Sequence, residues 1–181
     1  MGTKLDLGGI GKREGKGGWL SVNCGAGKYA DVDADITKLD DLFPDGSVEY
    51  ILCSHTFEHL GCWQTEDALR LWRRKLIQGG GLEIILPDGE DIVRRYAAGE
   101  VAWLTVTNVL YGVPQWLREN PYNQHLFAYS FESLKALIEQ CGFTFVERKR
   151  RDWEHNYANE ADQPYFGKFR VNDIHIICRA S

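Results

Sequence analysis

The segment 48–60, with the sequence VEYILCSHTFEHL, decides the fold of this chain. Its first part, 48–53, is a short apolar run of β-forming residues behind a Pro-Asp-Gly turn at 44–46, and this pattern predicts a buried strand. The run ends abruptly in Ser-His-Thr, and an amphipathic segment follows. Ligands of open α/β sheets bind beyond the carboxyl ends of the strands, so residues 54–58 are predicted to lie at the mouth of a binding site.

Similar apolar runs alternate with helix-length segments along the rest of the chain. We predict strands at 4–7, 19–22, 32–36, 48–53, 82–86, 143–147 and 171–178. Helical periodicity and helix-start signals predict helices at 66–77, 92–96, 101–110 and 130–140. Three consecutive glycines at 79–81 are expected to end the first of these helices. This alternation is typical of a parallel, doubly wound α/β sheet.

The overall composition limits the classes of protein to consider. The 181 residues predict one domain, 1–181, and an apolar content of 44% is enough for a sizeable core. A net charge of −5 argues against a nucleic-acid partner held by its phosphates. The five cysteines form no C-x-x-C pair, so reduced thiols and a cytoplasmic location are expected. The sequence shows neither a secretory signal core nor a long apolar run, so we expect a soluble protein without a membrane partner.

Two segments depart from the strand–helix alternation, 90–130 and 151–170. We predict that these insertions form a substrate pocket, a lid or an interface. They and their flanks carry aromatic side chains that suit a sugar or aromatic acceptor, and that equally suit a homodimer contact. These residues are Trp103, Tyr111, Trp116, Tyr122, Tyr129 and Trp153.

The motifs along the chain occur in a characteristic order. A Gly-rich turn is followed by a strand ending in Asn, an acidic third strand, S-H-x-x-E-H-L, a helix, G-G-G-L-x-I-x-L-P-D and F-E-S-L-K-x-L-I-E-x-C-G-F. Over most of residues 4–150, this series resembles a compact class I S-adenosylmethionine-dependent methyltransferase of the methyltransferase-11 type. The resemblance implies a Rossmann-like, mostly parallel, seven-stranded sheet with helices on both faces and an antiparallel last strand. It also implies S-adenosylmethionine as cofactor and a small-molecule or saccharide acceptor.

The resemblance assigns the first cofactor-binding residues to the turn after the first strand. Asp6 would face the methionine amine, and Gly8, Gly9 and Gly11 would let the backbone approach the cofactor. Ile10 departs from the pattern, because it stands where the family has its second glycine. A β-branched residue is strained where a turn needs positive φ, so this departure is expected to shift the loop or weaken cofactor binding.

The remaining cofactor positions follow the ends of later strands. Asn23 stands where the family usually has an acid, and it would hydrogen-bond the ribose hydroxyls without charge assistance. The resemblance places two further residues at the adenine ring and three near the methionine part. The residues at the adenine ring are Asp35 and Ile36. The residues near the methionine part are Ser54, His55 and Glu58.

Methyl transfer is an in-line displacement, so the protein contributes chiefly by positioning the acceptor, and a general base is optional. His55 and His125 are the predicted catalytic residues, and Asp88 is a further candidate base at the same edge of the sheet. His125 also has a structural reading as a hydrogen-bonded histidine before a helix.

Two other hypotheses belong to different classes. The departures at Ile10 and Asn23 motivate a non-catalytic methyltransferase-like binding or scaffold protein, in which restoring Gly and Asp would raise cofactor affinity. The string His55-Thr56-Phe57-Glu58-His59 also matches the H-x-x-E-H signature of zinc hydrolases. That motif needs one continuous helix, whereas His55 ends a strand-like run, so we assign no metal ligands. The NAD, Walker A and EF-hand patterns each fail at a required position.

Overall fold

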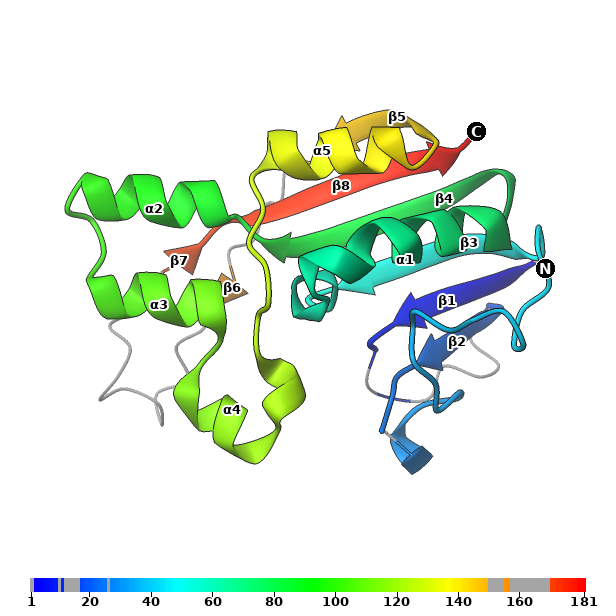
Figure 1. The fold of residues 1–181 in the computed structure, drawn as a ribbon, viewed down its shortest axis with the longest axis horizontal. Helices are drawn as coiled ribbons and strands as arrows, with labels where there is room; N and C mark the ends of the chain where they lie inside the picture. The colour runs from blue at the N-terminus through cyan, green and yellow to red at the C-terminus, as the bar shows by residue number, and fades with distance from the viewer. Residues whose placement is uncertain (1, 10, 12–16, 26, 150–154, 157–169) are drawn as a thin grey trace.

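A mostly parallel sheet forms the centre of the molecule. The computed structural model describes residues 2–9, 11, 17–25, 27–149, 155–156 and 170–181. The six strands of the main sheet lie in the order β2-β1-β3-β4-β8-β5 (Figure 1). In chain order they are β1 (Thr3–Leu7), β2 (Trp19–Val22), β3 (Val48–Ser54), β4 (Leu76–Pro87), β5 (Phe143–Arg148) and β8 (Asp173–Ala180). β1 to β4 pair in parallel, and β8 is antiparallel to both of its neighbours, which confirms the predicted α/β class and the antiparallel last strand.

The prediction of a strand at 32–36 is wrong, and the main sheet therefore has six strands instead of seven. Only an isolated bridge joins Val32 to Val22. The carboxylates beside it are used locally, because Asp33 accepts from the amide of Gly25 and Asp35 accepts from the amide and hydroxyl of Thr37. Asp side chains that bond nearby backbone in this way offer the chain an alternative to a strand ladder. A separate antiparallel pair lies in and just after the insertion 151–170, and it consists of β6 (His155–Asn156) and β7 (Arg170–Val171).

The main core lies between the sheet and two helices, α1 (Cys62–Lys75) and α5 (Phe131–Gln140). Trp72 of α1 and Ile138 of α5 are fully buried with Ile51 and Ile84 of the sheet. Both helices pack on the same face, in front of the sheet in Figure 1. Within the described residues, the expected helical cover is thus seen on one face of the sheet.

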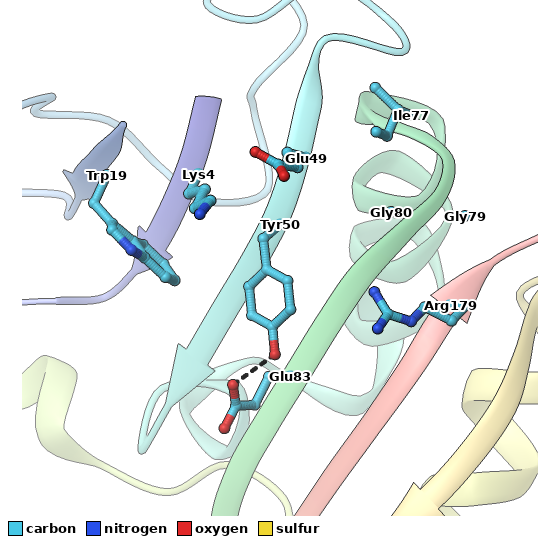
Figure 2. A pocket seen from close by; sticks show the side chains of 9 residues that line it. All are labelled: Lys4, Trp19, Glu49, Tyr50, Ile77, Gly79, Gly80, Glu83 and Arg179. Atoms are coloured by element: carbon cyan, nitrogen blue, oxygen red, sulfur yellow. Dashed lines mark hydrogen bonds between the residues drawn. The ribbon is translucent and has the colours of Figure 1, made fainter. Parts of the chain in front are cut away.

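The opposite face of the sheet carries an open pocket of about 450 Å³ (Figure 2). Tyr50 crosses it and donates a hydrogen bond from its hydroxyl to Glu83 at 2.7 Å, and Arg179 and Lys4 flank this pair. In the part of the chain that the structure describes, no helix shields these side chains.

The passage from α1 to β4 differs from the prediction. The helix ends at Lys75 rather than at 77, and β4 starts at once and continues through the three glycines. Gly79 has a φ of +75°, and the pairing between β3 and β4 shifts register there. The glycines therefore provide an irregularity inside a strand rather than a break between a helix and a strand.

The insertion 90–130 lies beyond the carboxyl ends of β3 and β4, at the end of the sheet where the site was expected (Figure 1). It consists of α2 (Gly89–Ala97), α3 (Trp103–Tyr111), α4 (Pro114–Glu119) and the 3-10 turn η3 (Pro121–Asn123). α2 and α3 share a second, smaller core that includes Ile92, Val106 and Val109. Two more 3-10 turns, η1 (Gly27–Tyr29) and η2 (Phe57–His59), complete the described elements. Among the helices described, none has the length and apolarity needed to cross a membrane.

Candidate functional site

The glycine turn after β1 is packed tightly against the exit of β3. Gly8 has a φ of +79° and donates from its amide to the carbonyl of Val22 at 2.8 Å. A Cβ on Gly8 would lie 2.0 Å from the hydroxyl oxygen of Thr56, and one on Gly9 would lie 2.1 Å from a carboxylate oxygen of Asp6. Gly8 therefore requires glycine for both its φ and its space, and a side chain at Gly9 would force the carboxylate of Asp6 to move.

Gly11 has a different environment from the first two glycines. Its φ is +109°, and among the described residues no atom lies within 4 Å of a Cβ built there. Its amide is tied to the carbonyl of Tyr29 at 2.8 Å. The backbone at Gly11 therefore borders open space, where a ligand can approach it. Ile10, which departs from the family pattern, lies outside the described residues.

Asn23 holds the glycine turn from the end of β2. Its side-chain Nδ2 donates to the carbonyl of Gly8 at 3.0 Å and approaches that of Gly9 at 3.5 Å. Two carbonyl oxygens can only accept, so the amide nitrogen must face the turn. The sequence predicts that Asn23 binds the ribose, and the structure shows that the nitrogen of its side-chain amide holds the glycine turn.

The predicted adenine position is held by the core. Ile36 is buried, and its carbonyl accepts a 2.9 Å hydrogen bond from the indole nitrogen of the fully buried Trp72. One carboxylate oxygen of Asp35 accepts from the amide and hydroxyl of Thr37, and the other oxygen lies 3.3 Å from Nζ of Lys38. Burial raises the pKa of Asp35, but the bonds to Thr37 and the charge of Lys38 together outweigh burial, and the net shift of the pKa is downward. The loop is thus a fixed wall that carries a carboxylate.

His55 stands at the strand exit between two carboxylates. It has a φ of +49°, which is uncommon for a residue with a side chain. Its Nδ1 lies 3.6 Å from Glu58, and its Nε2 lies 3.5 Å from Asp173 at the start of β8. Burial by itself lowers the pKa of His55, but Asp173 and Glu58 outweigh burial and raise the pKa to about 9. His55 is therefore an imidazolium at neutral pH, which cannot accept a proton.

His125 lies near the same carboxylate but in a different protonation state. Burial lowers the pKa of its imidazole, so the ring is neutral at pH 7. Its Nδ1 contacts the carbonyl of Val109 at 2.7 Å, and its ring meets that of His59 edge-on at 4.9 Å between centroids. The carbonyl of Glu58 accepts from the amides of Leu126 and Phe127, so the chain around His125 is anchored to the exit of β3.

Other predicted site residues have local tasks. Asp88 caps α2 by accepting from the amides of Glu90 and Asp91, and it pairs with Arg148 at 2.9 Å, so it is committed to structure. Among the aromatic candidates, three are exposed, Tyr129 is buried in the core, and the side chain of Trp116 and all of Trp153 lie outside the described residues. The exposed three are Trp103, Tyr111 and Tyr122.

The structure rules out the H-x-x-E-H arrangement of a zinc hydrolase. His55 follows β3 with a left-handed backbone, and the 3-10 turn η2 begins only at Phe57. His55 and His59 therefore do not share the face of one helix. The sequence analysis missed Asp173, which no local motif marks, because only the antiparallel pairing of β8 with β4 brings it to the exit of β3.

Comparisons with known proteins agree with this geometry. Residues 20–84 match a family model described as a methyltransferase domain, of the methyltransferase-11 type. No curated protein sequence matches the chain. A SAM-dependent methyltransferase from Archaeoglobus fulgidus is similar in structure, with a TM-score of 0.61, 18% identity, and coverage of 98% of this chain and 86% of that one.

Further structures share the same architecture. YcgJ from Bacillus subtilis matches with a TM-score of 0.59 and 13% identity over 98% of this chain and 91% of its own. A possible histamine N-methyltransferase from Thermotoga maritima matches with a TM-score of 0.56 and 16% identity over 100% of this chain and 83% of its own. With the family match and the sheet order, these likenesses identify a class I S-adenosylmethionine-dependent methyltransferase fold. Within that class, residues 20–84 are similar to the methyltransferase-11 domain.

The residues present fit the cofactor of that class. The turn at Gly8 and Gly9 admits no side chain, the backbone at Gly11 borders open space, and the exit of β3 lies directly beside them. Positive φ angles in such a turn direct backbone groups toward a bound ligand instead of into a helix. This wall of the site can therefore accept a close, extended ligand along the ends of β1 and β3.

Proposed function

We propose that this protein transfers a methyl group from S-adenosylmethionine to a small-molecule or saccharide acceptor. The observation that carries this proposal is the glycine turn, in which Gly8 and Gly9 are locked against Thr56 and Asp6 at the exit of β3. A turn built so that its backbone is bare beside the strand ends is what a class I methyltransferase needs to receive its cofactor.

Different residues of the chain would bind the methionine, ribose and adenine parts of the cofactor. Asp6 and Ser54 would lie near the methionine part, and Gly11 would supply bare backbone beside it. Asn23 would offer its side-chain oxygen to a ribose hydroxyl while its nitrogen holds the turn. Asp35, with Ile36 behind it, would face the adenine. The cofactor supplies a methyl group on a sulfonium, which is already activated for displacement.

The acceptor would enter from the side of the insertion 90–130. His125 faces this side from the chain anchored to Glu58, and its neutral imidazole is the group able to take a proton from a hydroxyl or amine. His55 would act through Glu58 as a positioning residue, because it is already protonated. The exposed rings of Trp103 and Tyr111 offer flat surfaces for a sugar or an aromatic ring.

Calorimetric titration with S-adenosylhomocysteine tests the proposal. We expect one site per chain with a dissociation constant in the micromolar range, or about −8 kcal/mol. The Gly8→Ala variant should abolish the heat of binding, and Gly25→Ala is its matched control. Gly25 has a similar φ of +74°, but a Cβ there meets no neighbour within 4 Å. Absence of binding by the folded wild-type protein would instead favour a non-catalytic binding or scaffold role.

A further inference from the structure

Three side chains with potential metal-ligand atoms converge beside the exit of β3. They are Glu58 and His59 of η2 and His125 of the chain that follows η3. One potential ligand atom from each lies within 4.8 Å of the others. Segments separated by more than sixty positions in the chain thus bring two imidazoles and a carboxylate to one point.

The two imidazoles are held in the same tautomer. Nδ1 of His59 lies 3.0 Å from the carbonyl of Gln124, and Nδ1 of His125 lies 2.7 Å from the carbonyl of Val109. A carbonyl oxygen can only accept, so in each ring the proton sits on Nδ1 and the lone pair sits on Nε2. Histidines that bind metals are oriented in this way, with the second nitrogen donating to a carbonyl or carboxylate.

Glu58 provides the second, independent observation. Its side chain is only 3% exposed, and within the described residues neither carboxylate oxygen has a hydrogen-bond donor. The imidazole of His55 lies 3.6 Å from one of these oxygens. A buried carboxylate costs several kcal/mol unless charges or hydrogen bonds compensate it, so one weak ion pair leaves this group under-satisfied.

We propose that Glu58, His59 and His125 form a three-ligand site for a divalent transition-metal ion such as Zn²⁺, with one coordination position left open. Two histidines and one carboxylate are a ligand set found in catalytic zinc sites and in other open transition-metal sites. Ligands at bonds of about 2.1 Å lie about 3.4 Å apart in a tetrahedral site, so binding closes the cluster by about an ångström. His55 then supports the ligating carboxylate from behind.

This site differs from both earlier expectations, since the sequence assigned no metal ligands and the H-x-x-E-H pattern used His55 in place of His125. The open position suits an oxygen ligand, and here the inference rests on the proposed function.

A metal lowers the pKa of a bound hydroxyl. The acceptor would lose its proton to water, its oxygen would form the new bond to the methyl carbon, and the carbon–sulfur bond would break with its electron pair going to sulfur. With the ion bound, Nε2 of His125 would be a metal ligand, and with the site empty the same atom would be the base of the proposed function.

Metal titration tests the site without any cofactor or acceptor, so its failure is distinguishable from a failure of methyl transfer. The 181-residue protein is stripped with a chelator and titrated with Co²⁺, read by visible absorption, and with Zn²⁺ against a chromophoric chelator. We expect one ion per chain with micromolar or tighter affinity, about −8 kcal/mol. Addition of acetohydroxamate should change the Co²⁺ spectrum, because it can occupy the open position.

Two variants and one control decide the ligands. His59→Gln and His125→Gln should each weaken Zn²⁺ binding at least about 100-fold, since the loss of a supporting partner alone costs 10–100-fold. His175→Gln should leave it unchanged, because His175 contacts Glu83 in β4 and lies outside the cluster. Each histidine variant is an independent test, and thermal unfolding shows whether it is folded. Two results would overturn the proposal: no binding by the wild type at about 100 µM metal, or wild-type affinity in both folded histidine variants.

Discussion

Asn23 gives the sharpest test, because the sequence and the structure predict opposite results for one substitution. The family pattern has an acid at this position, so sequence reasoning expects Asn23→Asp to raise cofactor affinity. In the structure, the side-chain nitrogen donates to the carbonyls of Gly8 and Gly9 at 3.0 and 3.5 Å. A carboxylate at the same place cannot donate, and it would bring negative charge against two carbonyl oxygens.

The magnitude follows from the bonds that are lost. One good hydrogen bond contributes about 1 kcal/mol net, and the second contact is at the limit of hydrogen-bond length. Asn23→Ala should therefore lower the free energy of unfolding by about 1 kcal/mol. If the cofactor must restore the turn when it binds, its affinity falls about fivefold. Repulsion adds to this loss, so Asn23→Asp should bind more weakly than Asn23→Ala.

The assay is calorimetric titration of the three proteins with S-adenosylhomocysteine, with urea unfolding of the same samples. We expect the order of affinity to be wild type, then Asn23→Ala, then Asn23→Asp. Asn23→Asp binding tenfold more tightly than the wild type would refute the reasoning, because the side chain would then serve the ribose and not the turn.

Three further substitutions test the scaffold of the site. His55→Gln removes the imidazolium, whose pKa is raised from 6.5 to about 9 in the folded protein. The charged ring therefore stabilises the fold fully below about pH 6.5, and this stabilisation is lost as the pH rises through about 9. In urea unfolding with a chelator, the advantage of wild type over this variant should shrink by on the order of 3 kcal/mol between about pH 6 and about pH 9.5, whereas a constant gap would contradict the assignment. Gly8→Ala places a Cβ 2.0 Å from Thr56, so thermal unfolding should show a loss of at least about 2 kcal/mol, and Gly25→Ala should lose less. Trp72→Phe removes an indole donor from a carbonyl at 2.9 Å, and a loss below about 1 kcal/mol would argue against that bond.

Local patterns were most informative where one short segment carries both the strand and its end. The apolar run at 48–53 became β3, and the polar residues after it lie at the site, because burial of alternate residues and a sharp exit are both properties of neighbouring residues. The same logic failed at 32–36, where the alternation of acids resembled a strand. There the side chains bond to nearby backbone, and a pattern of charge alone does not distinguish the two outcomes.

The sequence by itself determined the α/β class, the order of the motifs and the glycine turn, since each depends on residues close together in the chain. Only the tertiary structure decided which groups meet at the exit of β3. Asp173 reaches His55 through the pairing of β8, and His125 reaches Glu58 through two backbone hydrogen bonds. The protonation states of His55 and His125 follow from these long-range contacts. Burial and neighbouring charges set the pKa of a side chain, and neither is encoded in a local motif.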